Sequence, residues 1–308
     1  GYMARAAFIM DKIMHRMGLH GKSFIPLVMG FGCNVPAVMS TRIIESKSSR
    51  LITMLVNPFM SCSARLPIYV LLVSAFFPQN AALVLIGLYL LGIVVAILTA
   101  RLLRHTLFNK DETPFVMELP PYRFPSMKSA MHHMWEKTEQ YLRKMGTIIL
   151  VGSIAVWALN YFPRDFSKSN DEMSAIELEQ QQENSYLARI GKTVTPIIEP
   201  LGLNWKASVA LLSGVTAKEI VVSTLGVLYT VDDADEYSGM LKNRLAQPDK
   251  ISGQPDFNPA SALSFMVFVL LYFPCIATIA AIARESGRWR YGLFSIFYNT
   301  AVAWIVSF

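Results

Sequence analysis

The residues best suited to chemistry are three cysteines that lie where glycine or proline disturbs an apolar segment. The most unusual stretch contains Gly30, Gly32, Cys33, Asn34 and Pro36. Its glycines and proline leave backbone carbonyl groups without helical partners, while Cys33 offers a soft ligand and Asn34 a hard one. This mixture suits a borderline divalent metal such as Fe²⁺, Zn²⁺ or Co²⁺.

The other two cysteines have similar surroundings. Cys62 lies between Ser61 and Ser63, which add hydroxyl oxygens, and Cys275 directly follows Pro274, where a helix must distort and lose a hydrogen bond. One buried cysteine is usually just a small apolar side chain, but three at disturbed positions favour metal handling. Their odd number and wide spacing inside apolar segments do not form a disulfide framework.

Three ionisable residues, Arg65, Lys218 and Glu219, also lie inside apolar segments. Such residues usually mark a transport pathway or an ion pair; the alternative is a side chain that snorkels from a helix end. We predict that Glu219 faces the interior, paired with Arg65 or Lys218. Gly214 interrupts the same segment, as Gly30 interrupts the earlier one.

The motifs of soluble enzymes do not fit this chain. Gly21, Lys22 and Ser23 resemble the end of a phosphate-binding loop, but Arg16 stands where that motif needs a glycine. No histidine lies in an apolar segment beside a cysteine, so a nucleophile with an adjacent base is not expected. We therefore predict no nucleotide site and no enzyme activity in this chain.

Composition places the chain in a membrane. Of 308 residues, 53% are hydrophobic and only 16% charged, and the mean hydropathy is +0.38. Residues 66–100, 145–163, 257–283 and 291–308 carry no charge, and a transmembrane helix needs about 20 apolar residues. The net charge of +6 is typical of basic cytoplasmic loops, so we expect a lipid bilayer as partner and no nucleic acid.

The expected fold is an all-α, polytopic transmembrane protein with two broken, re-entrant segments at 24–41 and 206–229. Between them we expect a Pro-rich loop and an amphipathic helix at 127–145 on the membrane surface; the alternative is a solvated linker helix. The other expected spans are 51–77, 81–103, 146–162, 259–283 and 291–308. The chain then divides into a first repeat at 1–103, a cytoplasmic region at 104–145 and a second repeat at 146–308.

The two broken segments read as copies of one another. At a constant offset, Gly18 pairs with Gly202 and Gly30 with Gly214. Each copy is followed by a span that contains a proline and a cysteine. Because the loops at 40–50 and 284–290 are basic and those at 164–204 and 231–258 acidic, the positive-inside rule gives the copies opposite orientations. Inverted repeats of this kind form the midplane site of secondary transporters.

Several motifs resemble one known family. Residues 1–8 (Gly-Tyr-Met-Ala-Arg-Ala-Ala-Phe), 21–26 (Gly-Lys-Ser-Phe-Ile-Pro) and 30–37 (Gly-Phe-Gly-Cys-Asn-Val-Pro-Ala) are similar to the first gate region of ferrous iron transport protein B. Residues 217–222 (Ala-Lys-Glu-Ile-Val-Val) resemble its second gate. The contexts of Cys33 and Cys275 match as well, and the resemblance covers essentially the whole chain.

The resemblance implies a permease core for GTP-dependent Fe²⁺ uptake across the bacterial cytoplasmic (inner) membrane. Fe²⁺ is then the transported substrate, with Cys33, Cys62 and Cys275 as contacts along the path. GTP and Mg²⁺ belong to an N-terminal G domain; since the chain opens without an initiator methionine or a signal peptide, we expect a fragment that lacks this domain. Further expected partners are that G domain, small cytosolic accessory proteins and a second copy of the chain.

Two other functions remain open from the residues alone. A nucleoside-type or other small-solute transporter would share the broken segments but would not need the cysteines. A non-transporting membrane scaffold would show no substrate flux in proteoliposomes.

Overall fold

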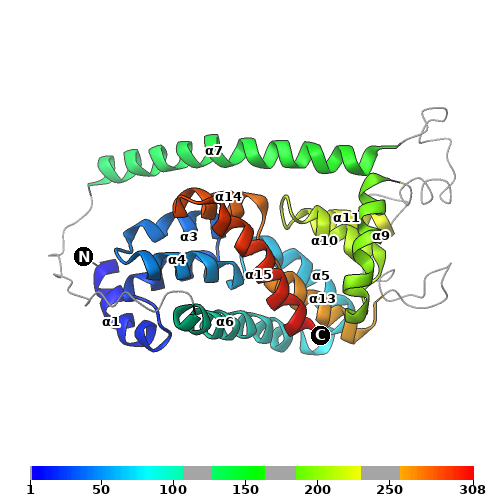
Figure 1. Cartoon of the computed structure of the whole chain (residues 1–308), viewed down its shortest axis with the longest axis horizontal. Coiled ribbons are helices and arrows are strands. Elements are labelled where there is room, and N and C mark those ends of the chain that lie inside the picture. Colours follow the sequence, from blue (N-terminus) through cyan, green and yellow to red (C-terminus); the bar gives the residue numbers. More distant parts are fainter. Residues whose placement is uncertain (1, 107–125, 164–184, 230–256) are drawn as a thin grey trace. The chain divides into compact units, whose positions relative to one another are not determined.

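The computed structural model describes residues 2–106, 126–163, 185–229 and 257–308. Within these ranges every regular element is an α-helix or a short 3-10 helix, and no strand occurs (Figure 1). The expectation of an all-α chain is confirmed. Backbone contacts divide the chain into unit 1 (Gly1–Ser63, Tyr89–Leu150 and Ile276–Tyr298) and unit 2 (Ala64–Leu88, Val151–Cys275 and Asn299–Phe308). The predicted regions 1–103, 104–145 and 146–308 were defined by the sequence repeat, whereas the two units are defined by backbone contacts. The units therefore do not test the predicted regions.

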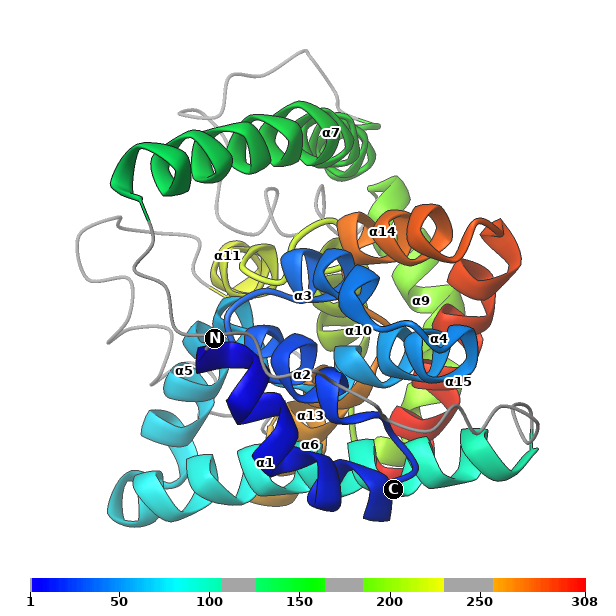
Figure 2. The ribbon, with the colours of Figure 1, turned by 90° about the vertical axis from the view of Figure 1, so that its left-hand side faces the viewer.

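Unit 1 contains the first broken segment. Its helices in chain order are α1 (Tyr2–Arg16), η1 (Gly21–Ser23), α2 (Phe24–Gly30), α3 (Asn34–Ser40), η2 (Thr41–Ile43), α4 (Lys47–Val56), η3 (Asn57–Phe59) and α14 (Ile276–Ser286). The two halves of the broken segment, α2 and α3, pack on each other, and α14 lies along α3 and also contacts α4 (Figure 2).

Unit 2 contains the second broken segment. Its helices are α5 (Leu66–Phe76), η5 (Pro78–Asn80), α9 (Tyr186–Ile198), η7 (Glu199–Leu201), α10 (Trp205–Ser213), α11 (Ile220–Tyr229) and α13 (Pro259–Leu271). A β-carbon on Gly191 would lie only 2.5 Å from Cγ2 of Val209, so glycine is what lets α9 approach α10 closely. Leu187, Ala188 and Leu228 complete the core around this contact.

The two predicted copies share their local structure. Each is a helix, a break and a second helix: α2 and α3 flank residues 31–33, and α10 and α11 flank residues 214–219. The paired glycines Gly18 and Gly202 both adopt left-handed backbone, with φ of +77° and +71°, which favours glycine over other residues. Two residues later, His20 and Asn204 each accept a backbone hydrogen bond at the start of the next helix.

Among the described residues, three stretches are long and apolar enough to cross a membrane: Lys47–Phe76, Pro78–Thr106 and Pro259–Ser286. They match the spans expected at 51–77, 81–103 and 259–283. The second stretch contains α6 (Ala81–Thr106), whose exposed apolar side chains recur every three or four residues and suit contact with lipid. They are Leu83, Ile86, Leu90, Val94, Leu98 and Leu102. Residues 291–308, the last expected span, form most of α15 (Trp289–Ser307), which is not one of these three stretches.

The surface helix and the span expected on either side of residue 145 are one continuous helix, α7 (Met127–Tyr161). The sequence suggested a boundary at Gly146, yet a single glycine costs a helix only about 1 kcal/mol. No described residue lies within 4 Å of the place where a Gly146 β-carbon would stand, so none of them forces a bend. Met127, Met131 and Trp135 are exposed, as expected for a helix that offers an apolar face.

Candidate functional site: two broken helices with polar turns

The first break is a tight turn at residues 31–33, between α2 and α3. Backbone N–H groups of Gly32 and Cys33 both donate to the Met29 carbonyl oxygen, at 3.0 and 3.1 Å, which closes α2. Cys33 then takes extended backbone (φ −151°, ψ 130°), and α3 starts at Asn34. The Cys33 side chain is half-buried and that of Asn34 is buried. The predicted break therefore lies at the predicted residues.

A second polar turn, residues 57–63, meets this break within unit 1. Both the backbone N–H and the hydroxyl of Ser63 donate to the Gly32 carbonyl oxygen, at 3.2 and 3.0 Å. Since Gly32 precedes Cys33 and Ser63 follows Cys62, these bonds join the two cysteine-bearing turns. The sequence placed Cys33 and Cys62 in separate segments, and the fold brings these segments together.

Asn57 is a residue of this site that sequence reasoning missed. Its side chain is fully buried, and its amide nitrogen lies 3.4 Å from Oδ1 and 3.5 Å from the carbonyl oxygen of Asn34. Turned over, the Asn34 amide donates instead to the carbonyl oxygens of Gly30 and Asn57, at 3.2 and 3.3 Å, so either orientation keeps it inside the break. An asparagine directly before a proline in an apolar segment was the signal that could have found Asn57.

Close packing around Gly30 holds the two turns together. A β-carbon at Gly30 would lie 2.7 Å from Oδ1 of Asn57 and 2.9 Å from Cβ of Met60. The glycine is therefore needed for the approach of the two turns and not for backbone freedom. Pro36 lies in the first turn of α3, where a missing N–H costs nothing.

Hydrogen-bonding capacity is left over at this site. Oδ1 of Asn57 and the hydroxyl of Ser61 are buried and have no hydrogen-bond partner in the part of the chain that the structure describes. Unsatisfied buried polar atoms are rare and costly in native proteins. Together with the thiols of Cys33 and Cys62, they supply hard and soft donor atoms in one small region of unit 1.

The second break, in unit 2, is organised around a buried lysine. Lys218 is only 3% exposed, and its Nζ donates to the Phe273 carbonyl oxygen at 2.9 Å and lies 3.0 Å from the centre of the Tyr272 ring. At Gly214 a β-carbon would overlap Val221 and lie 2.7 Å from the Tyr272 hydroxyl. Gly214 thus has the same role as Gly30, the close approach of a second turn.

The prediction that Glu219 faces the interior is wrong, because its side chain is exposed. The neighbouring Lys218 points inward instead, and Arg65 is fully buried. Adjacent residues in the turn between α10 and α11 point to opposite sides, so only one of the pair can be enclosed. Its exposure leaves the carboxylate accessible to a hydrated cation.

Cys33 and Cys62 lie in the two hydrogen-bonded turns of unit 1. Cys275 is half-buried and belongs to unit 2, whereas the other two lie in unit 1. Across the described part of the chain, no group of three or more His, Cys, Asp or Glu residues could hold a metal ion. The convergence of all three cysteines stays a prediction.

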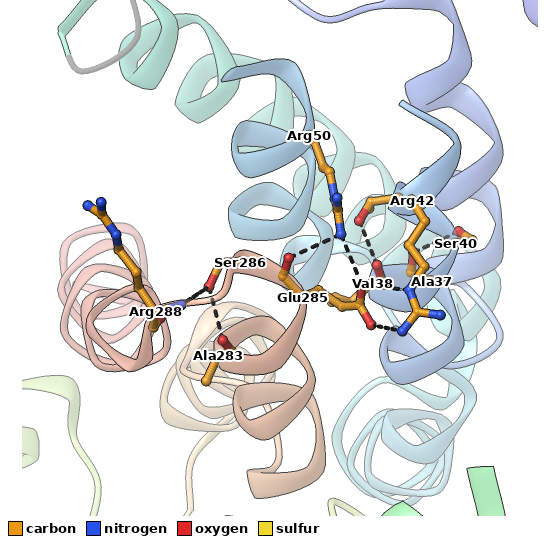
Figure 3. A network of polar contacts seen from close by, with 10 residues as sticks. Ala37, Val38, Ser40, Arg42, Arg50, Ala283, Glu285, Ser286 and Arg288 are labelled. Carbon is orange, nitrogen blue, oxygen red and sulfur yellow. Dashed lines mark hydrogen bonds and ion pairs between the residues drawn. The ribbon is translucent and has the colours of Figure 1, made fainter. Parts of the chain in front are cut away.

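An ionic clamp ties η2 and α4, which follow the first broken segment, to α14, and sequence reasoning missed it (Figure 3). Arg42 donates through Nε and Nη2 to the two carboxylate oxygens of Glu285, at 2.8 and 2.5 Å. Arg50 donates to the same carboxylate and to the Glu285 backbone carbonyl, at 3.0 and 3.1 Å. Because Arg42 donates these hydrogen bonds to the Glu285 carboxylate, the pKa of Arg42 is raised above its ordinary value. The clamp joins the basic stretches at 40–50 and 284–290, which the positive-inside rule assigned to the same side of the membrane.

Comparison with known proteins agrees with this description. A family model for gate domains, described as "Nucleoside recognition", matches residues 1–76 and 142–289, and a model described as "Ferrous iron transport protein B C terminus" matches residues 85–137. No solved structure matches.

Three curated relatives illustrate the similarity. An Fe(2+) transport protein A/Fe(2+) transporter FeoB fusion protein of Porphyromonas gingivalis is 57% identical over 100% of this chain and 40% of its own length. The Fe(2+) transporter FeoB of Campylobacter jejuni is 44% identical over 100% of the chain and 49% of the relative, and that of Methanocaldococcus jannaschii 42% over 100% and 43%. The chain therefore spans less than half the length of these relatives.

Proposed function

The chain belongs to the ferrous iron transport protein B family, as its C-terminal gate region, and on this premise we propose that it forms the membrane path for Fe²⁺ uptake across the bacterial cytoplasmic membrane. Uptake is coupled to GTP, and GTP with Mg²⁺ binds to an N-terminal G domain outside this chain. The chain itself is a permease core and carries no enzyme activity.

One observation carries the proposal: the two cysteine-bearing turns of unit 1, each of which interrupts an apolar segment, are hydrogen-bonded to each other. Broken backbone at membrane depth is tolerated only where protein or a water-filled cavity satisfies it. Polar turns of this kind form the substrate sites of membrane transporters. The donor atoms at the turns then decide which substrate fits.

These donor atoms suit an Fe²⁺ ion that passes through. Thiols of Cys33 and Cys62 are soft, while the Asn34 amide and the hydroxyls of Ser61 and Ser63 are hard, and a borderline cation accepts both. A transported ion must be bound tightly enough to enter and loosely enough to leave. Scattered donors without a complete ligand set match this requirement better than a closed metal site would.

The matching local structure of the two broken segments supports an inverted repeat. In that arrangement Cys275 and Glu219, from the second copy, join the path from the opposite side of the membrane. Labelling of introduced cysteines tests it: position 47 should react from the cytoplasm and position 233 from outside. Reaction of both positions from one side would contradict the inversion.

Partners follow from the same premise. The Porphyromonas gingivalis relative is a fusion with an Fe(2+) transport protein A, which supports a small cytosolic accessory protein as a partner of the system. We also propose the lipid bilayer, the G domain and a second copy of the chain as partners.

The test is Fe²⁺ uptake by the full-length protein in proteoliposomes, with GTP inside. We expect Cys33→Ser to lower Fe²⁺ uptake at least tenfold, because an alcohol is a poor substitute for a thiol toward this metal. Ser74→Ala is the control, since the Ser74 hydroxyl donates to the Leu71 carbonyl oxygen of its own helix. Zn²⁺ uptake measured in parallel shows whether the loss is specific for iron.

A second candidate is a nucleoside or other small-solute carrier, which the description of the gate model favours. It predicts solute uptake that survives replacement of Cys33, Cys62 and Cys275 together, and no Fe²⁺ flux. A protein that moves neither substrate would be a scaffold.

A further inference from the structure

Lys218 has a buried position that Fe²⁺ binding to the cysteines does not explain. Its ammonium group is enclosed at the second break, 2.9 Å from the Phe273 carbonyl oxygen, 3.0 Å from the Tyr272 ring centre and 5.5 Å from that of Phe273. A buried charge is costly and is usually kept for a function.

The groups around the ammonium form a site for a cation. The Phe273 carbonyl lies between the end of α13 at Leu271 and the start of α14 at Ile276, so no helix ladder uses it. A carbonyl oxygen and the face of an aromatic ring both attract positive charge.

The ring is held in place on several sides. The Tyr272 side chain is 1% exposed, its hydroxyl donates to the Leu211 carbonyl oxygen at 3.4 Å, and it stacks on Phe268. The ring is thus held rigidly, whereas the Lys218 ammonium group is carried by a flexible four-carbon side chain.

We propose that the Phe273 carbonyl and the Tyr272 ring are a cation-binding site of the transport path, and that the Lys218 ammonium fills it as a tethered competitor. The transported cation binds there and reaches Cys275, two residues beyond Phe273, only when the ammonium swings out. The proposal rests on the proposed function only for the identity of that cation.

Electrostatics make the two occupants exclusive. A monovalent and a divalent charge about 4 Å apart repel strongly even at a protein-surface dielectric. A lysine that moves away therefore opens the site, and one that returns expels the cation toward the next contact. The device combines a gate with a release step.

The test measures how fast a small cationic thiol reagent modifies Cys275 in the full-length protein in proteoliposomes, by mass spectrometry of the Cys275 peptide. Lys218→Met keeps the length of the side chain and removes its charge. We expect modification to become at least tenfold faster, as judged from the strength of a desolvated cation–π contact.

Lys206→Met is the matched control. Lys206 is also buried in unit 2, 6% exposed, and its Nζ lies over the Tyr229 ring at 5.0 Å, but it is far along the chain from Cys275. Its variant should change the rate less than about twofold. An unchanged rate in Lys218→Met, or an equal increase in both variants, would overturn the proposal.

If Lys218→Met does not fold, as judged by size-exclusion chromatography, a second pair of variants decides. Tyr272→Leu removes the ring face and should speed Cys275 modification, whereas Tyr272→Phe keeps the ring and should not. Equal rates in the two would overturn the proposal.

Uptake distinguishes this inference from the proposed function. With GTP withheld, Lys218→Met should raise Fe²⁺ flux above that of the wild type. If Lys218→Met speeds Cys275 modification but the protein never transports Fe²⁺, the lysine gate is supported and the iron path is refuted. If the protein transports Fe²⁺ but Lys218→Met has the modification rate and the flux of the wild type, the iron path is supported and the lysine gate is refuted.

Discussion

Alanine at position 30 is the sharpest perturbation of the first break. Its β-carbon would lie 2.7 Å from Oδ1 of Asn57 and 2.9 Å from Cβ of Met60. These distances are 0.7 and 0.5 Å short of the 3.4 Å at which ordinary contact begins. Asn57 is fully buried and Met60 is 4% exposed, so neither can withdraw into free space.

The expected cost follows from this overlap. Overpacking a close-packed interior costs about 1–3 kcal/mol, and replacing a helical glycine by alanine returns about 0.5–1 kcal/mol. With the middle of each range, the net loss for Gly30→Ala is about 1.3 kcal/mol, and the ranges together span about 0–2.5 kcal/mol. Gly32→Ala is the control in the same break, because its β-carbon would meet only the Met29 carbonyl oxygen at 3.4 Å. We expect that variant to stay within about 0.5 kcal/mol of the wild type.

Thermal unfolding and Fe²⁺ uptake of the full-length protein measure the outcome. Gly30→Ala should lower the unfolding temperature of the membrane part by about 3 °C. It should also lower uptake about tenfold, because the overlap separates the two cysteine-bearing turns. If Gly30→Ala and Gly32→Ala behave alike in both assays, the argument that the turns must touch is refuted.

Three further predictions concern charged or titratable groups. Glu285→Gln breaks the clamp, whose carboxylate is 7% exposed, and should lower the free energy of unfolding by about 2 kcal/mol. This is less than the loss for a fully buried pair, because Arg42 is half-exposed. Glu45→Gln is the control: it breaks an exposed pair with Lys22 and should have little effect in thermal unfolding. Glu219→Gln should slow Fe²⁺ uptake, and an unchanged rate would remove Glu219 from the path. Burial lowers the pKa of His20 below 6.5, although Asp11 opposes the shift; the unfolded chain then binds the proton more readily, so stability is complete above pH 6.5 and falls as the pH drops toward the folded pKa. His20→Asn should flatten this dependence in unfolding scans below pH 6.5.

Much of the fold could be predicted because membrane segments have strong local signals. Glycine and proline inside an apolar segment indicated the first break, and Gly214 followed by Lys218 and Glu219 indicated the second; the structure has them at residues 31–33 and 214–219. The repeat predicted equivalent turns, and Gly18 and Gly202 share left-handed backbone. These features depend on backbone chemistry that each short segment carries by itself.

The contacts that decide the site were not predictable in the same way. Glu285 belongs to the stretch 284–290, whose net charge is positive, and only the fold shows that it accepts hydrogen bonds from Arg42 and Arg50, more than 230 residues away in the sequence. Of the neighbours Lys218 and Glu219, the sequence favoured the carboxylate as the enclosed residue, and the structure encloses the lysine. Side-chain direction inside a turn depends on its packed neighbours, which a single sequence does not reveal.

Protection of Cys33 by iron is the most direct test of the central claim that Fe²⁺ passes the bonded turns of unit 1. The measurement is the rate at which a thiol reagent modifies Cys33 and Cys62 in the full-length protein under anaerobic conditions, with and without Fe²⁺. We predict that Fe²⁺ slows modification of both cysteines and that Mg²⁺, which prefers oxygen ligands, does not. Equal rates with and without Fe²⁺, in a protein that takes up iron, would place the path elsewhere.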